Sequence, residues 1–310
     1  MIRFQGTECA VTDLFLDRAI GAFLGLAIGD AVGTTVEFLP RDAFTPMTDM
    51  VGGGPFRLEA GKWTDDTSMA LCLAESLLND PHLDQLDLMR RFLRWVEFGE
   101  NSSTGACFDI GKTTLSAIGR FRRDGNPVAG SKLPRDAGNG SIMRLAPVAL
   151  RWWHDPLTAE RVARRQSETT HGAVEAVDGC VALTRMLCGA IAGKGREVLM
   201  APIDLALAPA ISVVVNGSWR RKDAQEIAST GYVVHTLEAA LWAVGGSSGF
   251  EDAILRAVNL GHDADTTGAV AGQIAGAIYG LSGIPAHWRH RLYDAQRIAD
   301  ISQRLYEASS

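Results

Sequence analysis

The chain has 310 residues, enough for one large domain or two ordinary ones, and 46% of them are hydrophobic, which allows a sizeable buried core. Its 30 basic and 36 acidic residues give a net charge of −6. A nucleic-acid-binding protein usually carries a basic excess or stripe, so this balance argues against nucleic acid as a partner.

The cysteines and the start of the chain indicate a reducing compartment. Cys9, Cys72, Cys107, Cys180 and Cys188 are an odd number without metal-binding or redox spacing, so we expect reduced thiols, buried where the run is apolar. The first residues lack the basic region, apolar core and cleavage site of a secretory signal. No uninterrupted apolar segment has the length of a membrane span. We therefore expect a cytoplasmic protein without a membrane span.

The first predicted helix, residues 14–32, carries glycine at every fourth position: Gly21, Gly25, Gly29 and, just past its end, Gly33. Glycines at this spacing share one face of a helix. Each lowers helix propensity by about 1 kcal/mol, so the stripe suggests that another backbone packs closely against this face. Charged residues interrupt the apolar run, which favours a buried core helix over a membrane helix.

A second glycine stripe lies near the other end of the chain, at Gly268, Gly272, Gly276 and Gly280. It belongs to a predicted helix within residues 261–280. The two striped helices could pack on each other and bring the ends of the chain together. This pairing is a hypothesis, because the sequence contains only the stripes.

Oxygen-bearing side chains precede two predicted helices that are far apart in the sequence. A cap or the helix dipole explains one acid at such a position, whereas a cluster favours a cation site. Oxygen ligands fit Mg²⁺ or Mn²⁺ better than zinc, and four aspartates exceed what one Mg²⁺ normally takes, so two cations are expected. Calcium loops and enzymes that activate a diphosphate leaving group remain alternatives for such fragments. The clusters consist of Thr64, Asp65 and Asp66, and of Asp263, Asp265 and Thr266.

Two further acids follow the first striped helix, and each has a simple structural interpretation. Asp30 would be a cap or turn carboxylate, and Glu37 would be a solvated loop glutamate.

The remaining segments predict helices, and no linker or internal repeat divides them. Residues 125–139 predict a loop that ends at the cap of a helix running to residue 153. Residues 211–215 are the best strand candidate, but one short β-branched run does not predict a sheet. The other predicted helices are residues 70–78, 83–98, 105–121, 156–167, 173–192, 232–244, 251–260 and 288–306. We expect an all-α fold with a single compact multi-helix domain over residues 1–310, and a core over about 17–300.

Six segments of the chain resemble a known family. They are GDAVGTTVEF (29–38), GGGPFRLEAGKWTDDTSMAL (52–71), DAGNGSIMRLAPVAL (136–150), TTHGAVEA (169–176), GYVVHTLEAAL (231–241) and FEDAILRAVNLGHDADTTGAVAGQIAGAIYG (250–280). In this order they resemble the ADP-ribosylglycohydrolase family. They are most similar to the dinitrogenase-reductase-activating glycohydrolase branch, whose members remove ADP-ribose from arginine.

The resemblance implies an all-α hydrolase with two Mg²⁺ or Mn²⁺ ions that cleaves the N-glycosidic bond between ADP-ribose and arginine of a modified protein. The implied metal ligands are Thr64, Asp65, Asp66, Asp263, Asp265 and Thr266. The implied substrate-binding residues are Gly138, Asn139, Gly140, Ser141, Met143, His171 and Tyr232. Asp65 and Asp265 would be essential ligands. Glu37 would contact substrate or a metal-bound water, and Asp109 would assist at the ribose or the guanidinium.

One position departs from the family pattern. Lys112 stands where the family has an asparagine, so a cation lies where a cationic guanidinium would dock. This departure leaves other linkages open, namely serine-linked ADP-ribose and O-acetyl-ADP-ribose. A non-catalytic ADP-ribose-binding relative is a further alternative, although such a protein would not need the acidic clusters.

Overall fold

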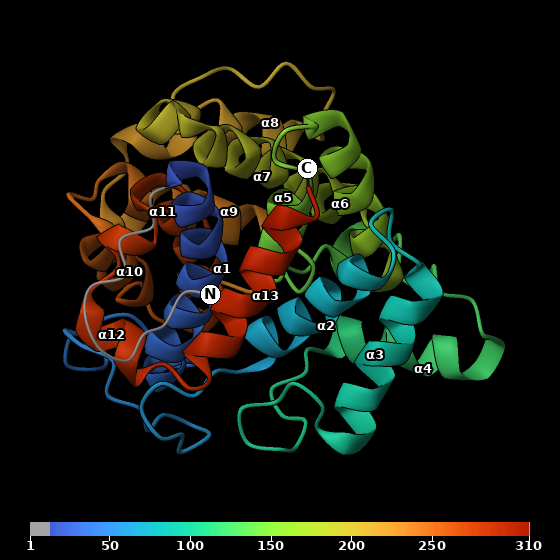
Figure 1. The fold of residues 1–310 in the computed structure, drawn as a ribbon. Coiled ribbons are helices and arrows are strands. Elements are labelled where there is room, and N and C mark those ends of the chain that lie inside the picture. The colour runs from blue at the N-terminus through green and yellow to red at the C-terminus, as the bar shows by residue number, and fades with distance from the viewer. Residues whose placement is uncertain (1–12, 310) are drawn as a thin grey trace.

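Helix α1 (Leu14–Gly33) lies at the centre of the molecule (Figure 1). Every residue from Ala19 to Gly33 is buried, because every residue there except Asp30 is apolar or glycine. A helix of this composition is stable only inside a core. Helices α2, α5, α10, α11 and α13 pack around it.

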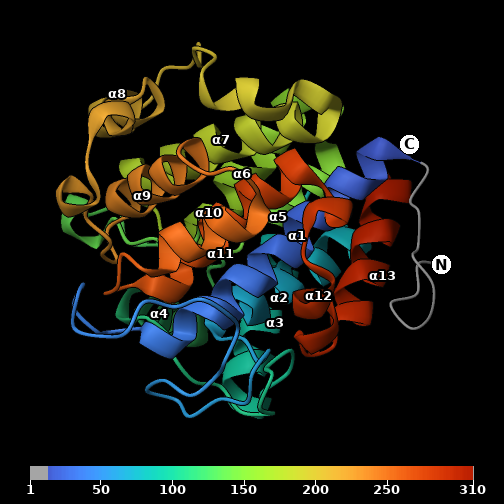
Figure 2. The same cartoon turned by 90° about the vertical axis from the view of Figure 1, so that its left-hand side faces the viewer.

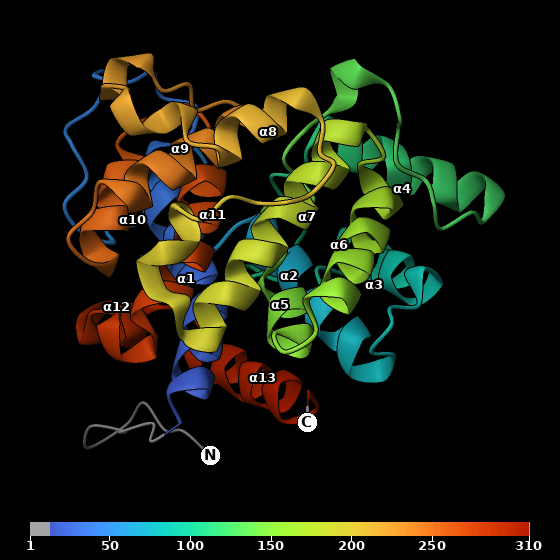
Figure 3. The ribbon, with the colours of Figure 1, turned by 90° about the horizontal axis from the view of Figure 1, so that it is seen from above.

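The structure is a computed structural model that describes residues 13–309, and no β-strand occurs among them. The all-α prediction is therefore confirmed, and the helices surround one hydrophobic core. Figure 3 shows α3 and α4 on the opposite side of the molecule from α10 and α12. The other helices are α2 (Asp65–Asn79), α3 (Gln85–Phe98), α4 (Lys112–Asp124), α5 (Ala146–Trp152), α6 (Pro156–Thr170), α7 (Val174–Gly189), α8 (Pro209–Val215), α9 (Val233–Gly245), α10 (Phe250–Val258), α11 (Ala264–Tyr279), α12 (Ala286–Arg291) and α13 (Ala295–Glu307).

The two glycine stripes face each other, as the pairing hypothesis proposed. Helices α1 and α11 lie side by side (Figure 2). In three glycine pairs, the carbonyl oxygen of each residue occupies the space where a β-carbon on the other would lie: Gly21–Gly276, Gly25–Gly272 and Gly29–Gly268. A β-carbon added to Gly272 would lie 2.0 Å from the carbonyl oxygen of Gly25, and one added to Gly276 would lie 1.9 Å from that of Gly21. Only glycine permits this approach of two backbones.

The ends of the described chain also meet. The Tyr306 hydroxyl on α13 donates a hydrogen bond of 2.8 Å to Asp13, whose carboxylate also caps α1. By length and composition two helical stretches, 14–36 and 174–199, could cross a membrane. In the structure 94% and 78% of the residues in their apolar windows are buried inside the protein, as in core helices. The described cysteines form no disulfide, and Cys9 lies outside the described residues.

The strand candidate is wrong, because residues 211–215 belong to helix α8. Pro209 occupies the first turn of this helix, and the buried residues Ile211, Val214 and Val215 share one face. Packing of this face decides the conformation over the β-propensity of a short branched run.

Three predicted helices were too long. The helix expected directly after residues 125–139 begins only at Ala146, as α5. Residues 105–111 precede α4 as irregular chain, with positive φ at Gly105 (80°) and Asp109 (60°), so Asp109 and Lys112 do not share a helix. Residues 288–306 divide into α12 and α13. Between them Asp294 has φ 46° and the Tyr293 amide donates to the carbonyl of Gly61, which ends α12.

Candidate active site

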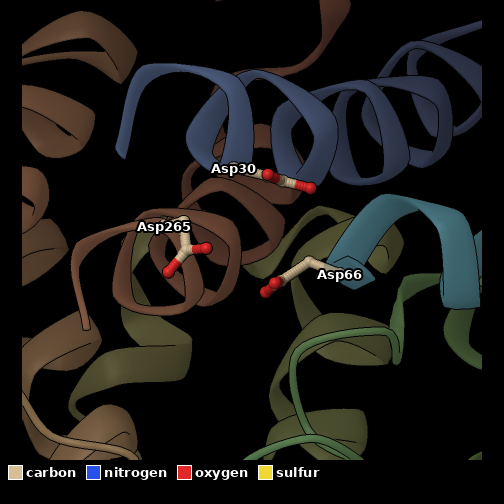
Figure 4. Close-up of side chains that lie close together, drawn as sticks. All are labelled: Asp30, Asp66 and Asp265. Carbon is tan, nitrogen blue, oxygen red and sulfur yellow. The ribbon is translucent and has the colours of Figure 1, made fainter. Parts of the chain in front are cut away.

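The N-termini of α2 and α11 meet, and so the two acidic clusters come together. The Thr64 hydroxyl lies 3.3 Å from the nearer carboxylate oxygen of Asp265 and 3.3 Å from that of Asp66. Carboxylate oxygens of Asp30, Asp66 and Asp265 all lie within 4.8 Å of one another. Figure 4 shows these three side chains converging from α1, α2 and α11.

Asp30 connects α1 to the start of α2. Its two oxygens accept hydrogen bonds from the backbone amides of Thr64 (2.9 Å) and Thr67 (3.0 Å). They also accept from the hydroxyls of the same two threonines, at 2.9 and 2.7 Å. Thr64 itself forms no side-chain cap, so a carboxylate from another helix caps α2. The cap interpretation of Asp30 is confirmed, but the helix that it caps lies across the site.

The glycine contact places the first residues of α11. A β-carbon on Gly33 would lie 2.4 Å from the carbonyl oxygen of Ala264 and 2.5 Å from the α-carbon of Asp265. The end of α1 therefore touches the backbone that carries Asp265. The same close packing that joins the helices sets the distance between the carboxylates.

Glu37 lies beside the second cluster and is not a solvated loop residue. The Phe38 amide donates to the carbonyl of His262, and the His262 amide donates to that of Leu39, each at 2.7 Å. These bonds hold Glu37 next to Asp263, and the side chain is only 4% exposed. One oxygen each of Glu37, Asp263 and Asp265 lies within 4.8 Å of the others.

The crowding of carboxylates shifts their protonation. Burial, and after it the negative charge of Asp265, raises the pKa of Asp30 and Asp263 to about 7 and that of Asp109 to about 11. The same two causes raise the pKa of Glu37 far above its usual range. Among residues 13–309 no lysine or arginine forms an ion pair with any of these groups. The positive charge that such a cluster requires must therefore come from protons or bound cations.

Three carboxylate oxygens of the site are buried without any hydrogen-bond partner among the described residues. They are Oε2 of Glu37, Oδ1 of Asp66 and Oδ2 of Asp109. A buried acceptor without a partner costs about 1–3 kcal/mol, and more when it is charged. Unpartnered oxygens in an all-oxygen donor set fit hard divalent cations.

A cavity of about 500 Å³ opens onto this cluster. Besides the carboxylates, the cavity has a wall formed by the start of α4, the loop before α5, and His171. Lys112 is exposed at this wall. The predicted residues that line the cavity are Glu37, Asp65, Asp109, Gly138, Asn139, Gly140, Met143, His171, Asp263, Asp265 and Thr266.

Four predicted residues do not line the cavity. Thr64 and Asp66 are fully buried within the acidic cluster. The Ser141 hydroxyl points into the core, where it accepts from Ser167 at 2.8 Å. The hydroxyl of Tyr232 donates to Glu175 at 2.7 Å, and the cavity wall is formed by the neighbouring Gly231.

The loop before α5 is tied to the acidic cluster. The side-chain amide of Asn139 donates to Asp263 at 2.5 Å and to the Thr236 hydroxyl at 2.9 Å. Its backbone amide donates to the carbonyl of Gly231. The position of this loop therefore depends on a predicted metal ligand.

Sequence analysis did not identify two polar residues that build the site, Asp30 and Thr114. Asp30 was interpreted only as a cap, although one of its oxygens reaches the cluster. Thr114 is 2% exposed and lines the cavity. Arg144 belongs to the loop that the family resemblance predicts to line the cleft (Gly138–Arg144), but its side chain is fully buried and does not line the cavity. An arginine in the apolar run around residue 144 was the one available signal of this burial, because such a residue needs partners.

Comparison with known proteins agrees with this arrangement. The sequence profile of the family described as ADP-ribosylglycohydrolase matches residues 11–310. The chain is 48% identical over 304 residues to the ADP-ribosylarginine hydrolase Tri1 of Pseudomonas putida (strain GB-1), covering 98% of this chain and 82% of the relative. It is 35% identical over 280 residues to the ADP-ribosyl-dinitrogen reductase glycohydrolase of Rhodospirillum rubrum, covering 89% of this chain and 90% of the relative.

A solved structure is similar over almost the whole chain. It is described as an ADP-ribosylglycohydrolase-related protein complex and superposes with a TM-score of 0.85 at 43% identity, covering 96% of this chain and 99% of the other. Sequence, fold and the position of the acidic cavity therefore lead to one assignment. The chain belongs to the ADP-ribosylglycohydrolase family of enzymes.

Proposed function

We propose that the protein hydrolyses the N-glycosidic bond between ADP-ribose and an arginine side chain of a modified protein in the cytoplasm. The observation that carries this proposal is the meeting of the α2 and α11 N-termini at one cavity. It supplies an oxygen-rich site beside a space of about 500 Å³. The names of the relatives from Pseudomonas putida and Serratia proteamaculans, both ADP-ribosylarginine hydrolases, support the arginine linkage.

Two divalent cations, Mg²⁺ or Mn²⁺, would be held by Thr64, Asp65, Asp66, Asp263, Asp265 and Thr266. When bound, they supply positive charge that holds ribose hydroxyl oxygens and makes a nearby water easier to deprotonate. The unpartnered oxygen of Asp66 supports this assignment, as does the lack of any ion pair to these four aspartates among residues 13–309.

Glu37 and Asp109 would divide the proton transfers between them. Glu37 lies within the group that contains Asp263 and Asp265, so cation binding would lower its pKa more than that of Asp109. Glu37 would then accept a proton from the attacking water. Asp109, whose pKa is raised to about 11 by burial and by Asp265, would hold a proton for the departing guanidine nitrogen.

The direct test is turnover on three linkages in the presence of Mg²⁺: arginine-, serine- and acetyl-linked ADP-ribose. We expect the arginine linkage to be cleaved fastest. The substitution Asp265→Asn should lower this rate by at least about 100-fold and weaken Mg²⁺ binding, with unchanged helicity. Asp204→Asn removes one charge from an exposed loop and serves as the control.

Two results would contradict the proposal. If Asp265→Asn were fully active, the cations held by Asp265 would have no part in catalysis. Tight ADP-ribose binding without turnover on any linkage would instead identify a binding protein.

A further inference from the structure

Arg144 is a buried cation without a buried anion. It is fully buried, and among residues 13–309 no carboxylate forms a hydrogen bond or ion pair with it. Burial lowers its pKa only to about 10, so the guanidinium stays charged at neutral pH. Its planar face lies 4.6 Å from the Phe92 ring centroid. Burying an unpaired charge is expensive, so its hydrogen bonds need an explanation.

These hydrogen bonds lead towards the cavity. Nε of Arg144 donates to the side-chain oxygen of Gln166 at 3.0 Å. Nη2 lies 3.1 Å from the Gln166 carbonyl and 2.9 Å from the hydroxyl of Thr170. The same Thr170 hydroxyl lies 2.9 Å from Nδ1 of His171. Arg144, Thr170 and His171 therefore form one chain of hydrogen bonds that ends at a cavity-lining imidazole.

Counting donors and acceptors fixes the direction of this chain. Arg144 can only donate, so the Thr170 oxygen accepts from it. The hydroxyl proton of Thr170 then has one recorded acceptor among the described residues, Nδ1 of His171. If Nδ1 carried a proton instead, the hydroxyl proton would be buried without an acceptor. The arrangement that satisfies every group leaves Nδ1 unprotonated.

The proton of the neutral ring must then sit on Nε2, which faces the cavity. Burial, and after it the charge of Arg144, lowers the pKa of His171 to about 3, so the ring is neutral at working pH. A β-carbon on Gly140 or Gly138 would lie 3.1 or 3.3 Å from Nε2, so this nitrogen lies beside two glycines of the cavity lining. No acceptor for Nε2 is recorded among residues 13–309.

We propose that Arg144 and Thr170 are positioning residues that lock His171 as the Nε2–H tautomer. They thereby aim one neutral, polarised donor into the cavity that the acidic cluster also lines. The donor would bind an acceptor oxygen of the ADP-ribose moiety, a part of the inference that rests on the proposed function.

The tautomer can be measured without ligand or turnover. Nitrogen-15 NMR of histidine-labelled protein distinguishes protonated from unprotonated ring nitrogens, and the His171→Gln variant identifies which signals belong to His171. We expect Nδ1 unprotonated and Nε2 protonated across pH 5 to 8 in the wild-type protein. A protonated Nδ1 in that sample would overturn the proposal, whatever the enzyme hydrolyses.

Two adjacent threonines, Thr169 and Thr170, allow a controlled test of the hydrogen bonds from Arg144 to His171. Thr170→Val removes the hydroxyl between Arg144 and His171, and Thr170→Ser retains it. Thr169→Val is the control, because the Thr169 hydroxyl also lies near Arg144 (3.4 Å) but has no recorded contact with His171. Thr170→Val should yield a mixture of tautomers, whereas Thr170→Ser and Thr169→Val should keep the wild-type spectrum.

Binding of free ADP-ribose, measured by calorimetry, connects the tautomer to the ligand. Thr170→Val should bind roughly 3- to 10-fold more weakly, which is the effect of one misplaced hydrogen bond, and Thr170→Ser should restore affinity. If Thr169→Val and Thr170→Val weakened ADP-ribose binding equally, the cause would be a general packing defect. The proposed role of Thr170 between Arg144 and His171 would then be overturned. A locked tautomer in a protein that hydrolyses none of the three linkages would contradict the proposed function alone.

Discussion

The pair of helices α1 and α11 has two different regions. Along most of its length the backbones touch through glycine, and at one end the same closeness brings Asp30 and Asp265 together. In the first region the contacts are between glycine backbones, and dispersion and exclusion of water stabilise them. In the second region the approach places like charges within 4.8 Å.

The comparison shows that the same close approach of the two helices stabilises the fold in one region and destabilises it in the other. The glycine region stabilises the fold without any ligand. The acidic region opposes it until protons or cations neutralise the carboxylates. The packing of the first region therefore holds the second in a state that favours cation binding.

The largest effect should come from breaking the glycine region. Gly272→Ala places a β-carbon 2.0 Å from a backbone oxygen on α1, so we expect a loss of ~4 kcal/mol in unfolding free energy or no folded protein. Gly119→Ala is the matched control, because a β-carbon there meets nothing within 4 Å. It should stabilise α4 by up to about 1 kcal/mol. Urea unfolding measures both, and equal effects would contradict the backbone contact.

The acidic region should make the stability of the cation-free protein depend on pH. The pKa of Asp30 and Asp263 is raised from 3.8 to about 7, so the folded state binds more protons than the unfolded state between these values. Stability should therefore be highest near pH 4 and fall as pH rises to 7, by about 3 kcal/mol for each of the two groups.

Chelation and Mg²⁺ distinguish this mechanism from ordinary titration. With EDTA the melting temperature should fall across the window from pH 4 to 7, and saturating Mg²⁺ should flatten or reverse that slope. A cation-free protein that becomes more stable with rising pH would contradict the crowding of charges.

A smaller effect should come from the cap that Asp30 of α1 provides to the N-terminus of α2. Asp30→Asn replaces an acceptor oxygen by an amide that faces the Thr67 amide and hydroxyl, both donors, so we expect a loss of ~2 kcal/mol at pH 8. Asp13→Asn is the matched control at the local cap of α1, where asparagine is equally suitable. Thermal unfolding at pH 8 compares the two. Equal losses of stability in the two variants would show that the cap from Asp30 contributes no more than an ordinary local cap.

The smallest effect should come from Lys112 at the mouth of the cavity. Removing this exposed cation by Lys112→Asn should lower KM for an ADP-ribosylated arginine peptide by about 2- to 5-fold, with kcat unchanged, if it repels the guanidinium. The difference should shrink in 0.5 M salt. Arg123→Gln removes the same charge from the far end of α4 and should leave KM unchanged. A rise in KM for Lys112→Asn would mean that the lysine attracts the substrate.

Sequence alone predicted the features that lie within continuous segments. The stripes from Gly21 to Gly33 and from Gly268 to Gly280 indicated the close helix pair, because their period is that of a helix face. The family resemblance indicated the cluster around Asp265. The roles of the individual site residues stay predictions until variants are assayed.

Features that depend on distant partners could not be predicted. Asp30 caps a helix that begins 35 residues later, at Asp65, and no local pattern marks a cap from another element. Arg144 acquires its role only because α6 brings Thr170 beside it. The break at Asp294 follows from a backbone bond to Gly61, far away in the sequence.

The hydrogen bond from Asn139 to Asp263 has one more consequence. The loop that borders the substrate space holds a carboxylate that is also assigned to a cation. A cation bound to Asp263 would weaken the hydrogen bond that Asp263 accepts from Asn139. A nucleotide that shifts the loop would in turn move this carboxylate relative to the cation. Occupancy at the two places is then thermodynamically linked, so each must alter the dissociation constant of the other by the same factor.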